Sequence, residues 1–307
     1  MKRLILFFGI ITIVIFVSFI EKGLSMRLFD KIFGTKNVVQ VKNLSEHRQF
    51  IDSLREPAIR IEKGNKSGLS KIGGLPIGNV SLRWPIWKGK PLAFLCQVDL
   101  DAIPKSEFST LLPSEGILYF FYDQEQSTWG FDPKDRGSWN VIYISKKNEL
   151  KPINAPAGLG KEYIYKEKNI KFSKILIYPD WQDDRIDKLN LNDSQSDEYF
   201  ELRSSIFQNQ PAHQLLGYPS PVQGNDMDLE SQLVSNGLYC GDATGYRDPK
   251  AKELESGRND WILLLQLDSD DDAGMMWGDV GMLYFWIRKS DLKKNDFSNV
   301  WMILQCS

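Results

Sequence analysis

Leu92-Ala-Phe-Leu-Cys-Gln-Val-Asp99 and Trp261-Ile-Leu-Leu-Leu-Gln-Leu-Asp268 share one pattern, an apolar run that ends in Gln-x-Asp. A second pair follows them, Gly116-Ile-Leu-Tyr-Phe-Phe121 and Gly281-Met-Leu-Tyr-Phe-Trp286. Short apolar runs bounded by polar and glycine residues are typical of buried strands. Because a gapless Gly-x-Leu-Tyr-Phe recurs together with Gln-x-Asp, the pattern indicates an internal repeat rather than a chance likeness.

The likeness extends beyond these strands. A Gly-x-Pro precedes each set, at residues 74–76 and 217–219, and an Asn-Val follows each set, at residues 140–141 and 299–300. Near-continuous apolar strands must be covered on both faces, so the two copies should share one core. We therefore predict one compact α+β domain, built from a duplicated, mainly antiparallel β-rich unit with a few peripheral helices and pseudo-two-fold symmetry. Repeat one spans about 70–145 and repeat two about 213–307.

Several motifs in order resemble a known bacterial family. They are Lys71-Ile-Gly-Gly-Leu-Pro76, His213-Gln-Leu-Leu-Gly-Tyr-Pro219 and Trp277-Gly-Asp-Val-Gly-Met-Leu-Tyr-Phe-Trp-Ile287, together with the strands above. Over roughly residues 57–307 the chain resembles the YwqG-like family. The resemblance implies a duplicated, mainly antiparallel α+β domain of unknown biochemical function, typically soluble and intracellular, and it assigns no catalytic residue.

The remaining chain divides into a hydrophobic segment, residues 1–25, and a lead-in with short helices, residues 26–56. Lys2 and Arg3 precede an apolar run of about 17 residues, 4–20, which is near the lower limit for crossing a bilayer. If translation starts at Met1, this run predicts a transmembrane helix, a single-pass anchor with the domain on the cytoplasmic side. A start at Met26 predicts a soluble cytoplasmic protein. Between the repeats we expect helices at 194–208 and 229–235, then a polar loop to about residue 260.

Composition excludes some function classes. Lys+Arg 38 against Asp+Glu 40 gives a net charge of -2, without the basic surplus that nucleic-acid binders use to neutralise phosphates. No nucleic-acid partner is therefore expected. The chain has only two histidines and three cysteines, so residues for zinc ligation or a Cys/His nucleophile are scarce. Cys96 and Cys306 lie in apolar stretches, which favours free thiols in a reducing compartment.

An acidic segment, residues 268–279, contains the sharpest candidate site. Asp268, Asp270, Asp272 and Asp279 reproduce carboxylate positions of a calcium loop, in which alternate side chains point at one cation. Two departures weaken this reading: Ala273 stands where the loop needs glycine, and Asp279 replaces the usual bidentate glutamate. We favour a solvated acidic connection between hydrophobic strands. No cofactor is expected, and calcium is the alternative.

Other candidate binding residues are polar or aromatic. Gln97 and Gln266 lie inside apolar strands and must be hydrogen-bonded when buried. Either each pins a loop of its own repeat, which we favour, or both line a shared cleft. Trp84 and Trp277 lie in or beside loops, where aromatics form recognition surfaces or plug the end of a core.

Two function classes remain open. The preferred one is a non-enzymatic binding or protein-interaction module with a protein partner. The alternative is a small-ligand or divalent-metal-binding protein, or an enzyme, with a cleft between the repeats. Since no nucleophile motif accompanies His213, we favour a structural histidine there.

Overall fold

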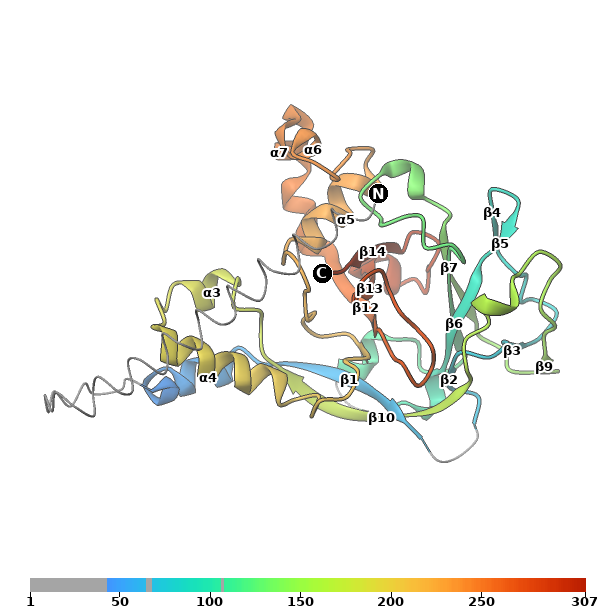
Figure 1. The fold of residues 1–307 in the computed structure, drawn as a ribbon, viewed down its shortest axis with the longest axis horizontal. Helices are drawn as coiled ribbons and strands as arrows, with labels where there is room; N and C mark the ends of the chain where they lie inside the picture. Colours follow the sequence, from blue (N-terminus) through green and yellow to red (C-terminus); the bar gives the residue numbers. More distant parts are fainter. Residues whose placement is uncertain (1–42, 65–67, 106–107) are drawn as a thin grey trace, which may run out of the picture. The chain divides into compact units, whose positions relative to one another are not determined.

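Ten strands of the chain form one antiparallel sheet, in the order β14-β13-β12-β11-β1-β10-β2-β6-β7-β8 (Figure 1). The computed structural model describes residues 43–64, 68–105 and 108–307. Of these, 43–307 belong to one compact unit. Two further pairs, β3 with β9 and β4 with β5, form small separate sheets. The predicted compact α+β domain with a mainly antiparallel sheet and a few helices is confirmed.

The strands have the following bounds: β1 Glu56–Lys63, β2 Lys71–Ile72, β3 Ile77–Gly78, β4 Ile86–Trp87, β5 Lys90–Pro91, β6 Ala93–Asp99, β7 Ile117–Tyr122, β8 Trp139–Ile144, β9 Lys151–Pro152, β10 Lys168–Ile177, β11 Gln214–Leu215, β12 Trp261–Asp268, β13 Met282–Arg288 and β14 Trp301–Gln305. The α-helices are α2 Arg48–Ser53, α3 Asp184–Asp187, α4 Asp193–Ser204, α5 Met227–Ser235, α6 Thr244–Arg247, α7 Pro249–Leu254 and α8 Lys289–Leu292. The 3-10 helices are η1 Leu44–Glu46, η2 Leu100–Ala102, η3 Phe108–Leu111, η4 Pro133–Asp135, η5 Lys161–Tyr163 and η6 Glu255–Asp260.

The two ends of the sheet have matching strand order and register. Strands β2-β6-β7-β8 occupy one end and β11-β12-β13-β14 the other. The β6/β7 ladder shifts register between Phe94 and Cys96, and the β12/β13 ladder shifts between Leu263 and Leu265. These are the same positions of the two matching sequence runs, so both strands accommodate one extra residue at one place.

The main core lies between these two ends, which face each other. Phe120 of β7 packs edge-on against Phe285 of β13, with ring centroids 5.2 Å apart. The two edges also meet, because Trp139 of β8 donates its indole N–H to the carbonyl of Val300 at 2.8 Å. Trp301 of β14 donates likewise to the carbonyl of Gly130. The sheet thus curls back on itself around a shared aromatic core.

A smaller satellite core lies at one end of the long β1–β10 pair. Helix α4 begins with a capping box, in which Asn192 and Gln195 satisfy each other's backbone N–H groups. Tyr199 of α4 packs on Tyr178, which directly follows β10, and Ile51 of α2 joins the same cluster. This places the segment that contains α3 and α4 beside the point where β1 begins and β10 finishes (Figure 1).

The region before β12 differs from the prediction. A polar loop was expected up to about residue 260, but α6, α7 and η6 fill this stretch. Asp248 caps α7 by accepting from the N–H of Lys250, and Pro249 occupies the first turn. Polar composition concealed these helices because they are short and only Ala251 of α7 is buried. The helices expected at 194–208 and 229–235 correspond to α4 and α5.

The prediction of a transmembrane helix that serves as a single-pass anchor is not supported. Among the residues that the structure describes, no helix is long and apolar enough to cross a bilayer. The run at residues 4–20, on which the anchor rested, lies outside the described residues.

Candidate functional site

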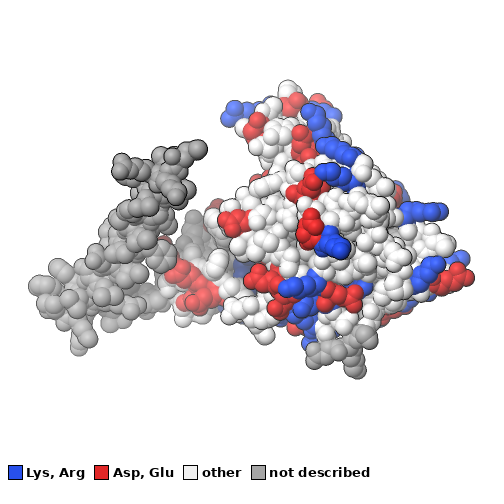
Figure 2. Space-filling view, turned by 45° about the vertical axis from the view of Figure 1, so that its right-hand side comes forward, with Lys and Arg blue, Asp and Glu red and all other residues white. Residues whose placement is uncertain are grey.

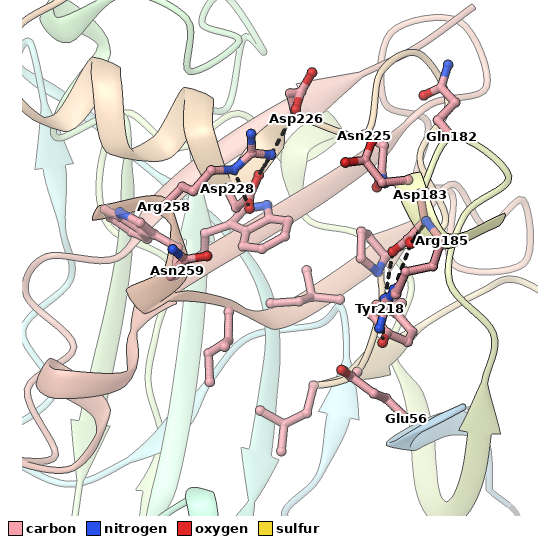
Figure 3. Close-up of a pocket in the computed structure, with 18 of the residues that line it drawn as sticks. Glu56, Gln182, Asp183, Arg185, Tyr218, Asn225, Asp226, Asp228, Arg258 and Asn259 are labelled. Carbon is pink, nitrogen blue, oxygen red and sulfur yellow. Dashed lines mark hydrogen bonds and ion pairs between the residues drawn. The ribbon is translucent and has the colours of Figure 1, made fainter. Parts of the chain in front are cut away.

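An open cleft of about 1140 Å³ lies over β12 and β13 (Figure 3). Its floor contains Leu263 and Trp286, which are register partners on these two strands. Since Phe285 points into the core and successive side chains of a strand alternate, Trp286 belongs to the opposite, outer face of the sheet. The walls are the segment 181–188, the loop 216–226, and Arg258 and Asn259 of η6.

Three glutamines fix the loop that forms one wall. Gln214, Gln266 and Gln305 project from β11, β12 and β14, and none is more than 1% exposed. Their amides bind the backbone of Leu216, Tyr218, Ser220, Val222, Gln223 and Gly224 at distances of 2.7–3.0 Å. Buried hydrogen bonds of this kind hold the loop in one conformation, so this wall is preorganised.

The adjoining wall, segment 181–188, carries a guanidinium held by a carboxylate. Arg185 of α3 donates from Nε and Nη2 to both oxygens of Asp183, at 2.8 and 2.7 Å. Its Nη2 also donates to the hydroxyl of Tyr218 at 3.0 Å. The carboxylate of Asp183 raises the pKa of Arg185, and burial raises the pKa of Tyr218 to about 12. Arginine is therefore charged and fixed, and the tyrosine keeps its proton near neutral pH.

A second fixed guanidinium stands across the cleft (Figure 3). Arg258 of η6 donates to both oxygens of Asp228, at 3.0 and 2.7 Å, and to Asp226 at 2.8 Å. Partial burial acts to lower the pKa of Arg258, but its hydrogen bonds with Asp228 and Asp226 raise it overall. The cleft thus presents planar cations whose carboxylate partners restrict their motion.

The overall charge of the cleft is slightly negative. Its lining includes six carboxylates and four cations, listed here by sign: Glu56, Asp183, Asp184, Asp187, Asp226 and Asp228 against Arg185, Lys188, Arg258 and Lys289. On the face that Figure 2 draws, side chains of both signs are interspersed without a broad stripe of one sign. Of the described residues that line the cleft, none is His, Cys, Ser or Thr. The side chains that line the cleft can form ion pairs, hydrogen bonds and apolar contacts with a ligand.

The predicted glutamines pin loops of their own halves. Gln97 accepts from the backbone N–H of Ile77 at 2.7 Å, and Gln266 accepts from that of Ser220 at 2.7 Å. Neither side chain lines the cleft, so the alternative, a shared cleft that both would line, is not formed. Gln266 nevertheless supports the cleft wall through its bond to the loop.

The predicted tryptophans have structural surroundings. Trp277 is 0% exposed and packs edge-on against Tyr122 and Tyr165, so it plugs the core and presents no recognition surface. Trp84 is partly buried, and its indole N–H donates to the carbonyl of Leu92 at 2.9 Å. Flanking glycines and acidic residues suggested an exposed loop around Trp277, but the tight turn folds this ring inward.

The four aspartates of the acidic segment do not converge on one point. Asp268 accepts from the N–H of Ala212 at 2.8 Å, Asp272 pairs with Lys63, and Asp279 is exposed. Within the described residues no group of three or more His, Cys, Asp or Glu is arranged to hold a metal ion. The calcium-loop geometry, the alternative that the spacing suggested, is thus not formed, because Asp270 and Met275 pair backbone to backbone in a tight turn and the carboxylates contact different protein groups.

Asp270 instead pairs with the buried histidine. Nδ1 of His213 accepts from the N–H of Asp268 at 3.0 Å, and its Nε2 lies 3.5 Å from Asp270 Oδ2. His213 and Lys63, whose Nζ lies 3.4 Å from Asp270 Oδ1, hold the pKa of Asp270 well below its usual range. These contacts tie the acidic segment to β11 and β1, which agrees with a structural histidine.

Comparison with known families adds one result. A family described as a domain of unknown function, DUF1963, matches residues 70–306. The chain belongs to this family. No curated protein matches the chain. The matched part of this DUF1963 protein begins after β1, although β1 lies near the centre of the sheet between β11 and β10.

The residues that build the cleft of this DUF1963 protein were not predicted from the sequence. Arg185, Tyr218 and Arg258 lie far apart in the chain and carry no shared motif. One local signal existed, because Tyr218 belongs to the repeated Gly-x-Pro landmark whose loop the glutamines hold. The acidic partners Asp226 and Asp228, at the start of α5, looked like ordinary helix-start residues.

Proposed function

We propose that this DUF1963 protein is a non-enzymatic binding module that takes a segment of a partner protein into the cleft over β12 and β13. The single observation that carries the proposal is the preorganisation of this cleft. One wall is held by three buried glutamines, and both arginines are locked by carboxylates before any ligand arrives. Sites of this kind lose little conformational entropy on binding, and arginine and aromatic groups supply much of the energy at protein interfaces.

The size and chemistry of the cleft favour a macromolecular segment over catalysis. At about 1140 Å³ it is larger than most drug-sized ligand sites and stays open to solvent on one side. Trp181, at its rim, exposes 58% of its surface and so offers an aromatic face to a partner. An exposed aromatic beside fixed charges suits contact with a protein surface.

We also propose that the two ends of the sheet are copies of one unit, related by pseudo-two-fold symmetry, as the YwqG-like resemblance implies. The shared register shift supports this, and so does a shared pair of contacts. Tyr119 donates to the carbonyl of Ile77 at 2.8 Å, and Tyr284 donates to that of Ser220 at 2.7 Å. Ile77 and Ser220 both follow the proline of the Gly-x-Pro landmark.

Affinity capture with matched variants tests the binding proposal. The full tagged chain is compared with Trp181→Ala, at the cleft rim, and with Ile86→Ala, an exposed apolar residue of β4 that does not line the cleft. We expect one partner to be captured by the parent chain and by Ile86→Ala but reduced at least fivefold by Trp181→Ala. Equal capture by all three would contradict a role for the cleft.

A further inference from the structure

A second hollow, a groove of about 500 Å³, lies between residues 181–191 and helix α4, beside the cleft (Figure 1). Trp181 and Asp187 line both the groove and the cleft, so the two hollows share these residues. The large aromatic side chains of the groove are exposed. Trp181 is 58% exposed and Phe200 of α4 is 65% exposed. A ligand can therefore pack on both rings without displacing a side chain of the protein.

A buried ion pair fixes the position of the two exposed rings. Arg203 of α4 donates from Nη1 to Asp180 Oδ2 at 2.7 Å, and Asp180 is only 5% exposed. The same carboxylate accepts from the backbone N–H of Gln182 at 3.0 Å, so it also holds the turn that carries Trp181. Phe200 lies three residues before Arg203 on one face of α4. The groove is thus shaped before any ligand arrives.

The groove carries uncompensated negative charge. Of the described residues that line it, Arg203 is the only cation, and Asp180 neutralises it. The carboxylates of Asp187 and Asp197 are exposed, and neither has a hydrogen bond or ion pair with another described residue. Asp197 lies three residues before Phe200, on the same face of α4. A ligand that packs on the rings therefore meets two free carboxylates beside them.

These charges select the class of ligand. Nucleic-acid phosphates and anionic lipid headgroups carry the same sign as Asp187 and Asp197 and are repelled. A lysine or arginine side chain is attracted twice, by the carboxylates and by the exposed face of Trp181. The apolar area of Trp181, Phe200 and the partly exposed Leu191 requires an apolar side chain next to the cation. Lysine or arginine beside apolar residues is a chemistry that a protein segment supplies.

We propose that the partner segment that enters the cleft continues past Trp181 into this groove, and that this part of the segment is both basic and apolar. An apolar side chain packs against Trp181 and Phe200. Lysine or arginine side chains next to it pair with Asp187 and Asp197. This inference rests on the proposed function and names the chemistry of the partner at the same site.

Two short peptides of opposite charge supply the probes, acetyl-Lys-Phe-Lys-Leu-Lys-amide and acetyl-Glu-Phe-Glu-Leu-Glu-amide. Each is titrated into the full ¹⁵N-labelled chain, and the indole N–H resonance of Trp181 is identified by its absence from Trp181→Phe. We expect the basic peptide to shift this resonance and to bind about threefold or more tightly than the acidic one. Phe200→Ala should weaken the basic peptide about threefold or more. Phe50→Ala, at an exposed phenylalanine of α2 outside the groove, should not.

A charge exchange tests the ion pairs. Asp187→Lys with Asp197→Lys should reverse the preference, so that the acidic peptide binds more tightly. The matched control is Glu253→Lys with Asp271→Lys, which changes the net charge equally at exposed positions outside the groove. Circular dichroism and the melting temperature check that each variant is folded. No binding of the basic peptide at millimolar concentration, binding that leaves Trp181 unshifted, or a preference that the exchange does not reverse each overturns the inference.

Partner capture separates this inference from the proposed function. Leu111 is 46% exposed and lines the cleft but not the groove. Capture that is reduced by Trp181→Ala and Leu111→Ala but is indifferent to the charge exchange would leave the proposed function standing and the inference wrong. Capture that Trp181→Ala and Leu111→Ala leave unchanged would contradict the proposed function itself.

Discussion

Gln266 and Tyr284 are register partners on β12 and β13, and together they hold one residue of the neighbouring loop. Gln266 accepts from the N–H of Ser220, and Tyr284 donates to its carbonyl. Gln97 and Tyr119 hold Ile77 in the same way. The two glutamines differ in one respect. The Gln266 amide nitrogen also donates to the carbonyl of Ala212 at 2.6 Å, whereas the Gln97 amide nitrogen has no partner among the described residues.

Replacing Gln266 or Gln97 by alanine should therefore lower the free energy of unfolding by different amounts. Gln266→Ala leaves two buried backbone groups unpaired and should lower the free energy of unfolding by about 2–4 kcal/mol. Gln97→Ala leaves one and should cost about 1–2 kcal/mol. Urea denaturation of both variants measures the difference. Equal costs would show that the contact with Ala212 contributes nothing.

The parts of the fold that sequence could predict are those with a strong local period. The strands β6, β7, β12 and β13 were recognisable because their apolar runs are buried on both faces. The order of the strands was not, since β1 and β10 lie between the two ends and pair over eight residues without any repeated motif. Pairing of distant strands depends on tertiary contacts that no local pattern records.

The cleft was harder to predict than the fold for a physical reason. Asp183 is local to Arg185, but Arg258 meets Asp226 and Asp228 only through the tertiary fold, and the hydroxyl of Tyr218 reaches Arg185 from another loop. The acidic segment, by contrast, had a recognisable spacing but points its carboxylates at Ala212, His213 and Lys63. Spacing along a chain predicts convergence only when the backbone between the residues is known.

Added calcium tests directly whether the acidic segment, residues 268–279, lacks a metal site. Because Asp268, Asp270 and Asp272 already bind protein groups, millimolar calcium should leave the melting temperature unchanged within about 1 °C, a shift far smaller than a site held at 100 times its Kd would give. Thermal unfolding with and without the ion measures this, with magnesium as the control. A rise of several degrees that Asp270→Ala abolishes would restore the calcium site.

Glu230 of α5 should make stability fall as pH rises. Burial raises the pKa of Glu230 to about 7, although the hydroxyl of Tyr246 donates to it at 2.9 Å. In the unfolded chain this carboxyl loses its proton near pH 4.3. Between these two values the folded state binds the extra proton, so ionisation progressively favours unfolding and the penalty is complete above about pH 7.

Glu230→Gln should remove this penalty while keeping an acceptor for Tyr246. We expect it to stabilise the protein by roughly 1–3 kcal/mol at pH 8 and to have little effect at pH 4. Denaturation at both pH values is the measurement, and Glu253→Gln, an exposed glutamate of α7, is the control. A gain of the same size at pH 4 would mean that the effect is not ionisation.

Two glycines test how the edges of the sheet meet. Gly130 and Gly274 both have positive φ, +86° and +70°, so a side chain is strained at each. At Gly274 a Cβ meets open space, and Gly274→Ala should cost only about 1–2 kcal/mol.

At Gly130 a Cβ would lie 1.9 Å from the carbonyl oxygen of Met302 on β14. The backbone there would have to move, which would break the bond from Trp301 to the Gly130 carbonyl. Gly130→Ala should therefore cost at least about 2 kcal/mol more than Gly274→Ala in urea denaturation, through the added loss of a buried hydrogen bond and of core packing. Similar costs would mean that the junction between β14 and residues 129–130 does not stabilise the curled sheet.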